Sequence, residues 1–145
     1  SDEVDPVLLR ALEKYFEDAR RPAPYLSSCD NELSLKFSSE RVTRGITATN
    51  SGFYGPQGRV LRLGLRDGSL SGKIESFSHK GRTISNLEME TAGIYGLSKL
   101  LGHRAVSLNA IIANRATGKF SSDPTALTDE LIRFTLERLA PKKPI

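Results

Sequence analysis

Apolar side chains recur every three or four residues in two stretches, one near each end of the chain. An Asp-Pro pair precedes each stretch (Asp5-Pro6 and Asp123-Pro124), and such a pair suits the cap and first turn of a helix. The first stripe consists of Leu8, Leu12, Tyr15, Phe16 and Ala19. The second consists of Leu127, Leu131, Phe134, Thr135 and Leu139. We therefore predict two amphipathic helices, the first of which ends at Pro22.

Three shorter helices are predicted between these two. One begins after Asp30 and places Leu33 and Phe37 on one face. The second covers residues 69–77. The third is the C-terminal part of residues 88–101, after which Gly102 suits the C-terminal cap.

Strands are predicted where β-branched and aliphatic side chains are dense, at residues 25–28, 42–48, 60–65, 82–87 and 105–113. The last of these is continuously apolar, which is typical of a strand buried on both faces. Strands that alternate with helices predict an α/β layer fold. The chain has no internal repeat and no linker, so we expect one domain.

Composition narrows the classes of function. The net charge is +4, but the basic residues are spread along the chain and aromatics are sparse, which does not favour a nucleic-acid surface. No apolar run approaches the ~20 residues of a membrane span. With the single cysteine Cys29, and with His79 far from His103, we expect no disulfide and no metal site. We expect a soluble cytoplasmic protein.

Dinucleotide and phosphate-loop motifs are absent, as is the G-x-S-x-G motif of serine hydrolases. Candidate chemistry lies instead in three polar clusters. The first contains Phe53, Gln57 and Arg59 in a loop rich in glycine. An aromatic face, an amide and a guanidinium suit a flat heterocycle that carries an imide. A Gly/Pro turn with a solvated arginine is the structural alternative.

The second cluster is the run Glu88-Met89-Glu90, after Asn86 and Leu87. In an extended segment Glu88 and Glu90 project to one side and Met89 to the other. Two carboxylates aimed at one pocket can bind the hydroxyls of a sugar and stabilise a cationic sugar carbon. The structural alternative is that both glutamates favour the positive N-terminus of the following helix.

The third cluster, Asn114-Arg115, follows the most apolar predicted strand. In open α/β sheets, ligands gather outside the carboxyl ends of the strands. All three clusters are expected at such positions, which favours one shared site.

Together these residues resemble a known family. The segments GITATNSGFYGPQGR (45–59), NLEMETA (86–92) and IIANR (111–115) resemble the C-terminal half of uridine phosphorylase, in the nucleoside phosphorylase superfamily. The resemblance runs from about residue 40 to the end. It implies a partial phosphorylase/hydrolase-like domain, a three-layer α/β/α arrangement with a mixed sheet.

The resemblance also implies a role for each matching residue. Phe53 would stack on the pyrimidine, and Gln57 and Arg59 would hydrogen-bond the uracil edge. Glu90 would bind the ribose 2′-hydroxyl. The remaining substrate-binding residues would be Glu88, Met89, Ile112 and Arg115. Gln57, Arg59 and Glu90 would be catalytic. Purine-cleaving relatives place an Asp after the last strand, where this chain has Asn114-Arg115, so a pyrimidine is expected.

The implied reaction is phosphorolysis of uridine to uracil and ribose 1-phosphate, with phosphate as co-substrate and with no cofactor or metal. The resemblance implies a homo-oligomer, a dimer or a hexamer of dimers, in pyrimidine salvage. We therefore expect residues 1–145 to be the C-terminal part of such a domain, a fragment without the N-terminal phosphate-binding part and with little turnover of its own. A hydrolytic nucleosidase of the same superfamily and a non-catalytic nucleoside-binding domain remain alternatives.

Overall fold

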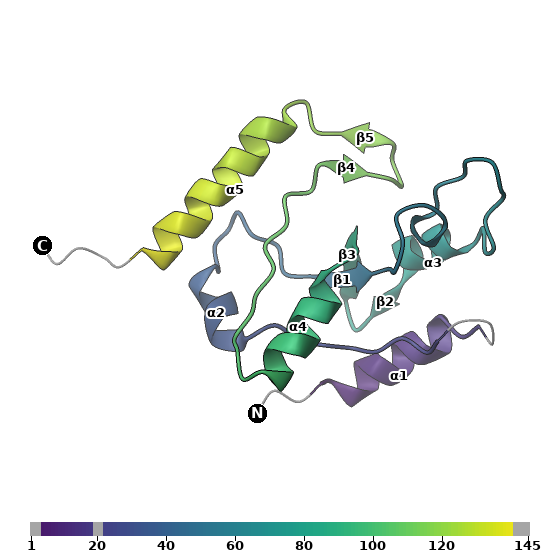
Figure 1. Cartoon of the computed structure of the whole chain (residues 1–145), viewed down its shortest axis with the longest axis horizontal. Helices are drawn as coiled ribbons and strands as arrows, with labels where there is room; N and C mark the ends of the chain where they lie inside the picture. The colour runs from purple at the N-terminus through teal and green to yellow at the C-terminus, as the bar shows by residue number, and fades with distance from the viewer. Residues whose placement is uncertain (1–3, 19–21, 141–145) are drawn as a thin grey trace, which may run out of the picture.

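The computed structural model describes residues 4–18 and 22–140 (Figure 1). Its helices are α1 (Pro6–Tyr15), α2 (Asn31–Lys36), the 3-10 turn η1 (Gly55–Gln57), α3 (Leu70–Ser76), α4 (Thr91–Leu100) and α5 (Pro124–Leu139). Its strands are β1 (Ile46–Thr49), β2 (Ser78–His79), β3 (Arg82–Glu88), β4 (Ala113–Asn114) and β5 (Lys119–Phe120). All five helices predicted from the sequence are found. The first, however, ends at Tyr15 and not at Pro22, because the chain leaves the helical conformation at Phe16; Ala19 lies outside the described residues.

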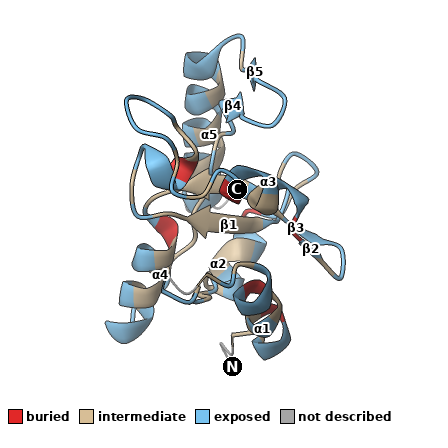
Figure 2. Ribbon diagram, turned by 90° about the vertical axis from the view of Figure 1, so that its right-hand side faces the viewer, coloured by how far each residue is buried: buried red, intermediate tan, exposed pale blue. Residues whose placement is uncertain are grey.

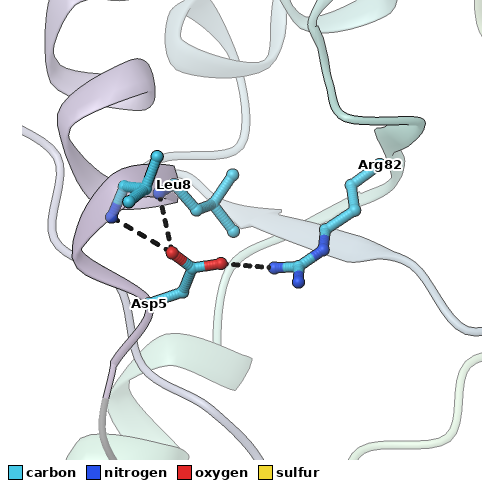
Figure 3. A network of polar contacts seen from close by, with 4 residues as sticks. Asp5, Leu8 and Arg82 are labelled. Atoms are coloured by element: carbon cyan, nitrogen blue, oxygen red, sulfur yellow. Dashed lines mark hydrogen bonds and ion pairs between the residues drawn. The ribbon is translucent and has the colours of Figure 1, made fainter.

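Aspartates begin the helices as predicted. The Asp5 carboxylate accepts hydrogen bonds from the backbone N–H groups of Val7 and Leu8, each at 3.1 Å. Its other oxygen accepts one from Arg82, in β3, at 2.9 Å (Figure 3). The hydrogen bond from the Leu8 N–H is the main cause that lowers the pKa of Asp5. The cap therefore also connects α1 to the sheet.

Three strands form a mixed sheet in the order β1-β3-β2. β1 is parallel to β3, with Ala48 opposite Leu87 and Thr49 opposite Glu88. β2 and β3 form an antiparallel hairpin whose turn, Lys80-Gly81, has both φ angles positive (51° and 77°), as a two-residue hairpin requires. The separate β4-β5 hairpin pairs Ala113 with Phe120. The predicted α/β class with a mixed sheet is confirmed.

Three of the five predicted strands do not form. Residues 25–28, 60–65 and most of 105–113 have no regular structure, and the strand predicted at 42–48 is found at Ile46–Thr49. Leu61 and Leu63 are 69% and 84% exposed, because the segment that holds them pairs with no strand in the described part of the chain. A strand needs a neighbour for its backbone groups, and local sequence does not supply one.

The core is small and lies between α1 and the sheet. Leu8 and Leu12 pack against Phe77, which is 2% exposed, together with Ile46 of β1 and Ile84 of β3. The ring of Phe77 also lies near those of Tyr15 and Phe16, with centroids 5.3 and 5.9 Å away. Figure 2 shows buried residues at few points, and exposed ones over most of α5 and the β4-β5 hairpin.

The last helix, α5, lies apart from this core. The ring centroid of Phe134 in α5 lies 6.2 Å from that of Phe37, which follows α2. Arg138 in α5 donates hydrogen bonds to the carbonyls of Lys36 and Ser38. None of the residues of α5 is buried. None of the helices in the described part of the chain has the length and apolar character needed to span a bilayer.

Candidate nucleoside-binding site

The loop after β1 is folded into a tight turn that aims Gln57 inward. Gly55–Gln57 form a 3-10 turn, and Gly58 closes it in the left-handed region with φ 76°. A Cβ on Gly58 would lie 2.2 Å from the Ser71 hydroxyl, so the turn requires glycine there for two reasons. The backbone N–H of Arg59 donates to the Tyr54 carbonyl at 2.9 Å. Gln57 is 5% exposed as a result.

Two arginines from distant parts of the chain hold the Gln57 side chain. Its Oε1 accepts a hydrogen bond from Arg59 at 2.9 Å and another from Arg115 at 2.6 Å. Arg115 also donates to the Gln57 backbone carbonyl. These bonds orient the amide, because Oε1 faces both guanidinium groups. The structure thus brings together the first and third clusters.

Phe53 is joined to the same group through Arg59. The Arg59 guanidinium lies over the Phe53 ring, 3.7 Å from its centroid, and donates to the Phe53 carbonyl. The ring is 52% exposed and meets Tyr54 edge-on at 5.2 Å between centroids. An accessible aromatic face therefore lies beside two positive charges.

Burial of the Arg115 guanidinium lowers its pKa, and the positive charge of Arg59 adds to this effect. Two cations are thus held close together around one neutral amide, and no carboxylate of the described residues accepts a hydrogen bond from either guanidinium. Such a pair favours a ligand that is electron-rich or that gains negative charge.

The second cluster lies where β3 ends and α4 begins. Oε1 of Glu88 accepts a hydrogen bond from the Thr49 hydroxyl at 2.5 Å. Its Oε2 accepts from the N–H groups of Glu90 and Thr91, at 2.9 and 2.7 Å, and from the Thr91 hydroxyl at 2.8 Å. The carboxylate therefore caps α4 and connects it to β1, which favours the structural alternative for this residue.

The balance of effects on Glu88 favours its charged form. Burial acts to raise the pKa of Glu88, but the hydrogen bonds from Thr49, Glu90 and Thr91 outweigh burial, so that the pKa is lowered overall. The carboxylate is ionised at neutral pH and fixed in place.

Glu90 differs from Glu88 in its exposure. Its side chain is exposed, and its carboxylate accepts a hydrogen bond from the Met89 N–H at 3.1 Å. Because β3 ends at Glu88, the strand alternation predicted for this run stops there, and Met89 and Glu90 lie in a bend. Glu90 thus has oxygens available for a hydroxyl group.

The parallel pairing of β1 and β3 brings the first two clusters to the same edge of the sheet, as predicted. Asn50 connects them. Its backbone N–H donates to the Glu88 carbonyl at 2.9 Å, and its side chain donates to the Pro56 carbonyl at 2.6 Å. The turn that carries Gln57 is therefore fixed relative to the end of β3.

Not every predicted residue joins this group. Ile112 is 41% exposed and immediately precedes β4, and its backbone carbonyl accepts from the Ser121 N–H, which is not part of this group. A cavity of about 1850 Å³ next to β1 is lined by Met89 and by Ile111, but not by Phe53, Gln57, Arg59 or Glu90. No group of acidic, cysteine or histidine side chains that could hold a metal ion occurs in residues 4–18 and 22–140.

Thr49 and Thr91 are functional positions that the sequence analysis missed. Thr49 accepts a hydrogen bond from the Ala92 N–H at 3.0 Å besides donating to Glu88, and Thr91 is 5% exposed. The spacing of Glu88 and Thr91, an acid three residues before a hydroxyl at a helix start, could have indicated their pairing, because it reverses the order of the capping box.

Comparisons with known proteins agree with the motifs. No family model matches the chain. Among curated proteins, the uridine phosphorylase of Thermococcus kodakarensis is 35% identical over 124 residues, which cover 79% of this chain and 41% of that protein. Among solved structures, the Trypanosoma brucei nucleoside phosphorylase, described as showing uridine phosphorylase activity, matches with a TM-score of 0.68 and 28% identity.

That match covers 78% of this chain and 42% of the Trypanosoma brucei chain. This chain therefore spans less than half the length of the proteins that it resembles. The resemblance to uridine phosphorylase that the motifs indicated is confirmed.

Proposed function

We propose that this chain is the base- and ribose-binding part of a uridine phosphorylase, a pentosyltransferase that converts uridine and phosphate into uracil and ribose 1-phosphate. The observation that carries the proposal is the Gln57 side chain held between Arg59 and Arg115 beside the accessible ring of Phe53. The similarity to the Thermococcus kodakarensis uridine phosphorylase supports it.

The proposed base site matches the chemistry of uracil. Uracil presents an N–H between two carbonyls. The Gln57 amide nitrogen and the two guanidinium groups offer donors for the carbonyls, and Oε1, which now accepts from Arg59 and Arg115, can accept from the uracil N–H once Arg59 turns to the base. As the bond to the base breaks, negative charge grows on uracil, and these fixed donors stabilise it, as an oxyanion hole does. Arg59 lies over Phe53, so a base that stacks on that face displaces Arg59 toward the carbonyl that it binds.

In this proposal, residues of the second cluster bind the ribose. Glu90 accepts a hydrogen bond from the 2′-hydroxyl, and Met89 packs against the sugar. Glu88, with both oxygens occupied by Thr49, Glu90 and Thr91, holds Glu90 and the start of α4 in position. In this proposal, Ile112 lines the base-binding side of the pocket. Phosphate attacks the sugar carbon on the face opposite the base, so the oxygen–carbon bond forms as the carbon–nitrogen bond breaks.

The phosphate site belongs, in this proposal, to the part of the domain that this chain does not include. No cofactor is needed, because phosphate is the nucleophile. The proposal includes a cytoplasmic role in pyrimidine salvage and a homo-oligomeric enzyme, as the resemblance implies.

The base site is tested by NMR titration of the chain with uridine. We expect shifts of the Gln57 side-chain amide and of the Arg59 and Arg115 guanidinium resonances, and smaller ones with adenosine. Shifts confined to other residues, or equal shifts with both nucleosides, would contradict the proposed specificity. Uracil release by the full-length enzyme with and without phosphate separates a phosphorylase from a hydrolytic nucleosidase, which needs no phosphate.

A further inference from the structure

One segment of the chain is extended but pairs with no strand in the described residues, although the carbonyl of its first residue, Ala105, accepts a hydrogen bond from the Asp30 N–H at 2.8 Å. Residues 105–112 follow α4 and run past the sheet toward β4 (Figure 1). At its start the Ser107 N–H donates to the Tyr95 hydroxyl at 2.8 Å, and at its end Ile112 accepts from the Ser121 N–H at 2.7 Å. Between them, the backbone of residues 108–111 makes no hydrogen bond within the part of the chain that the structure describes.

The sequence of this segment conflicts with such exposure. Apart from Ser107 and Asn109 it is apolar, as strands buried on both faces mostly are. Yet Ile111 is 51% exposed, and Leu108 and Ala110 are only half-buried. Unpaired backbone groups and exposed apolar side chains both cost free energy, so the segment is suited to neighbours that these residues do not provide.

β1 has an open edge as well. It pairs with β3 on one side, and as the first strand in the order β1-β3-β2 it has no neighbour on the other side in the described residues. An open edge presents a row of N–H and C=O groups that another strand can pair with.

Both features line the same hollow. The cavity of about 1850 Å³ is bordered by Thr47 and Ala48 of β1 and by Leu108 and Ala110 of the unpaired segment. Small-molecule sites span roughly 300–1,000 Å³, so this hollow is larger than a nucleoside needs. Asn86, which also lines it, has a buried side-chain nitrogen with no hydrogen-bond partner among the described residues. An unsatisfied donor in a residue beside the hollow is consistent with a missing neighbour that supplies a backbone carbonyl.

The chain exposes more surface than a folded monomer of its mass usually does. The chain exposes 10888 Å², whereas a folded monomer of 15.9 kDa exposes about 7,400 Å² by the usual scaling. The related proteins are more than twice as long as the part that this chain matches, so they contain the residues that could cover it.

We infer that the open edge of β1 and the segment 106–111 receive strands from the polypeptide that forms the rest of a phosphorylase domain. The occupant is a strand-forming segment with apolar side chains, which pairs with β1 on one side, supplies hydrogen bonds to residues 108–111 and accepts one from Asn86. The inference stands on the geometry of this edge and not on uridine chemistry, so it can fail while the proposed function holds.

The probe is the portion of the Thermococcus kodakarensis uridine phosphorylase that precedes the matched segment, made as a separate polypeptide and mixed with this chain without nucleoside. We expect a 1:1 complex by light scattering and at least tenfold slower amide exchange at residues 46–49 and 106–111. Leu108→Lys should weaken binding at least tenfold while it leaves the circular dichroism of the free chain unchanged. The matched control Leu63→Lys, at a position 84% exposed and outside the hollow, should change binding less than twofold.

If the separate polypeptide is insoluble, the same probe is fused to the N-terminus of this chain through a flexible linker. Slow exchange at residues 106–111 in the joined protein is the expected result. Fast exchange there would overturn the inference, and so would protection confined to other segments. Protection of this edge in the chain alone, together with a dimer by light scattering, would assign it to a second copy instead.

Discussion

Two polar side chains, Gln57 and Glu88, show how single residues are held in this molecule. The side-chain oxygens of each accept hydrogen bonds from one group nearby in the sequence and one far away: Arg59 and Arg115 for Gln57, and Thr91 and Thr49 for Glu88. The two residues differ in which groups around them remain available to bind a ligand. The Gln57 group lies beside an exposed ring and two cations, whereas both Glu88 oxygens are occupied within the protein.

Arg59→Ala should weaken uridine binding about 10- to 100-fold, because a hydrogen bond from a charged donor contributes about 1.5–3 kcal/mol. The measurement is the uridine dissociation constant from the NMR titration. Arg62→Ala, an exposed arginine in the same loop, is the matched control and should leave binding within twofold. Equal losses in the two variants would show that Arg59 acts only through general positive charge.

Glu88→Gln should lower the free energy of unfolding by about 1–2 kcal/mol, because one acceptor of the α4 cap is lost. Urea denaturation measures this change. Glu75→Gln, on the exposed side of α3, is the control and should change stability by less than about 0.5 kcal/mol.

The same variant changes the dependence of stability on pH. The pKa of Glu88 in the folded chain is lowered from its usual value of 4.5, so its contribution is fully present above pH 4.5 and is lost as the pH falls through the folded pKa. The acid-side loss of stability should be smaller in Glu88→Gln than in the wild type. An unchanged pH profile would contradict this account of the carboxylate.

At the scale of elements, the helices and the strands were not equally predictable. Asp5, Asp30 and Asp123 each cap the helix that follows, and the stripes of α1 and of α5 occur where the three- and four-residue spacing placed them. Helix caps and stripes are local, so the sequence contains them. The apolar runs at 60–65 and 105–113 are typical of strands, but in the described chain the first has no strand partner and the second pairs only at Ala113.

Leu12→Ala tests whether α1 and the sheet form the main core. Leu12 is 7% exposed against Phe77, and its loss should lower the free energy of unfolding by about 2–5 kcal/mol. Leu35→Ala, at a position 57% exposed on α2, should cost less than about 1 kcal/mol. Denaturation of both variants under the same conditions gives the two changes in the free energy of unfolding. Equal changes would show that the main core lies elsewhere.

The whole molecule has a stable part and an uncovered part. α1, β1 and β3 share the buried cluster, and α4 is connected to β1 through Thr49. The segment 108–111 and α5 lie outside this unit, the first without backbone partners in the described residues and the second with no buried residue. Local stability should follow this division, because opening is easiest where little is buried.

Amide exchange of the chain alone measures that division. Amides of residues 84–88 in β3 and of residues 94–100 in α4 should exchange slowly, and those of residues 108–111 should exchange at close to the rate of an unfolded peptide. Uniform protection along the chain would show that the segment 105–112 has hydrogen-bond partners in solution. There would then be no reason to infer that a neighbouring strand is missing.

The sequence by itself determined the helices, the α/β class and the turn that carries Phe53, Gln57 and Arg59, because capping, periodicity and glycine conformation act over a few residues. Only the tertiary structure decided that Arg115 reaches Gln57 across 58 residues and that Glu88 caps a helix. It also decided that residues 108–111 have no backbone hydrogen bond in the described part of the chain. Contacts between distant residues depend on which strands are present to pair, and a local pattern contains no information about an absent neighbour.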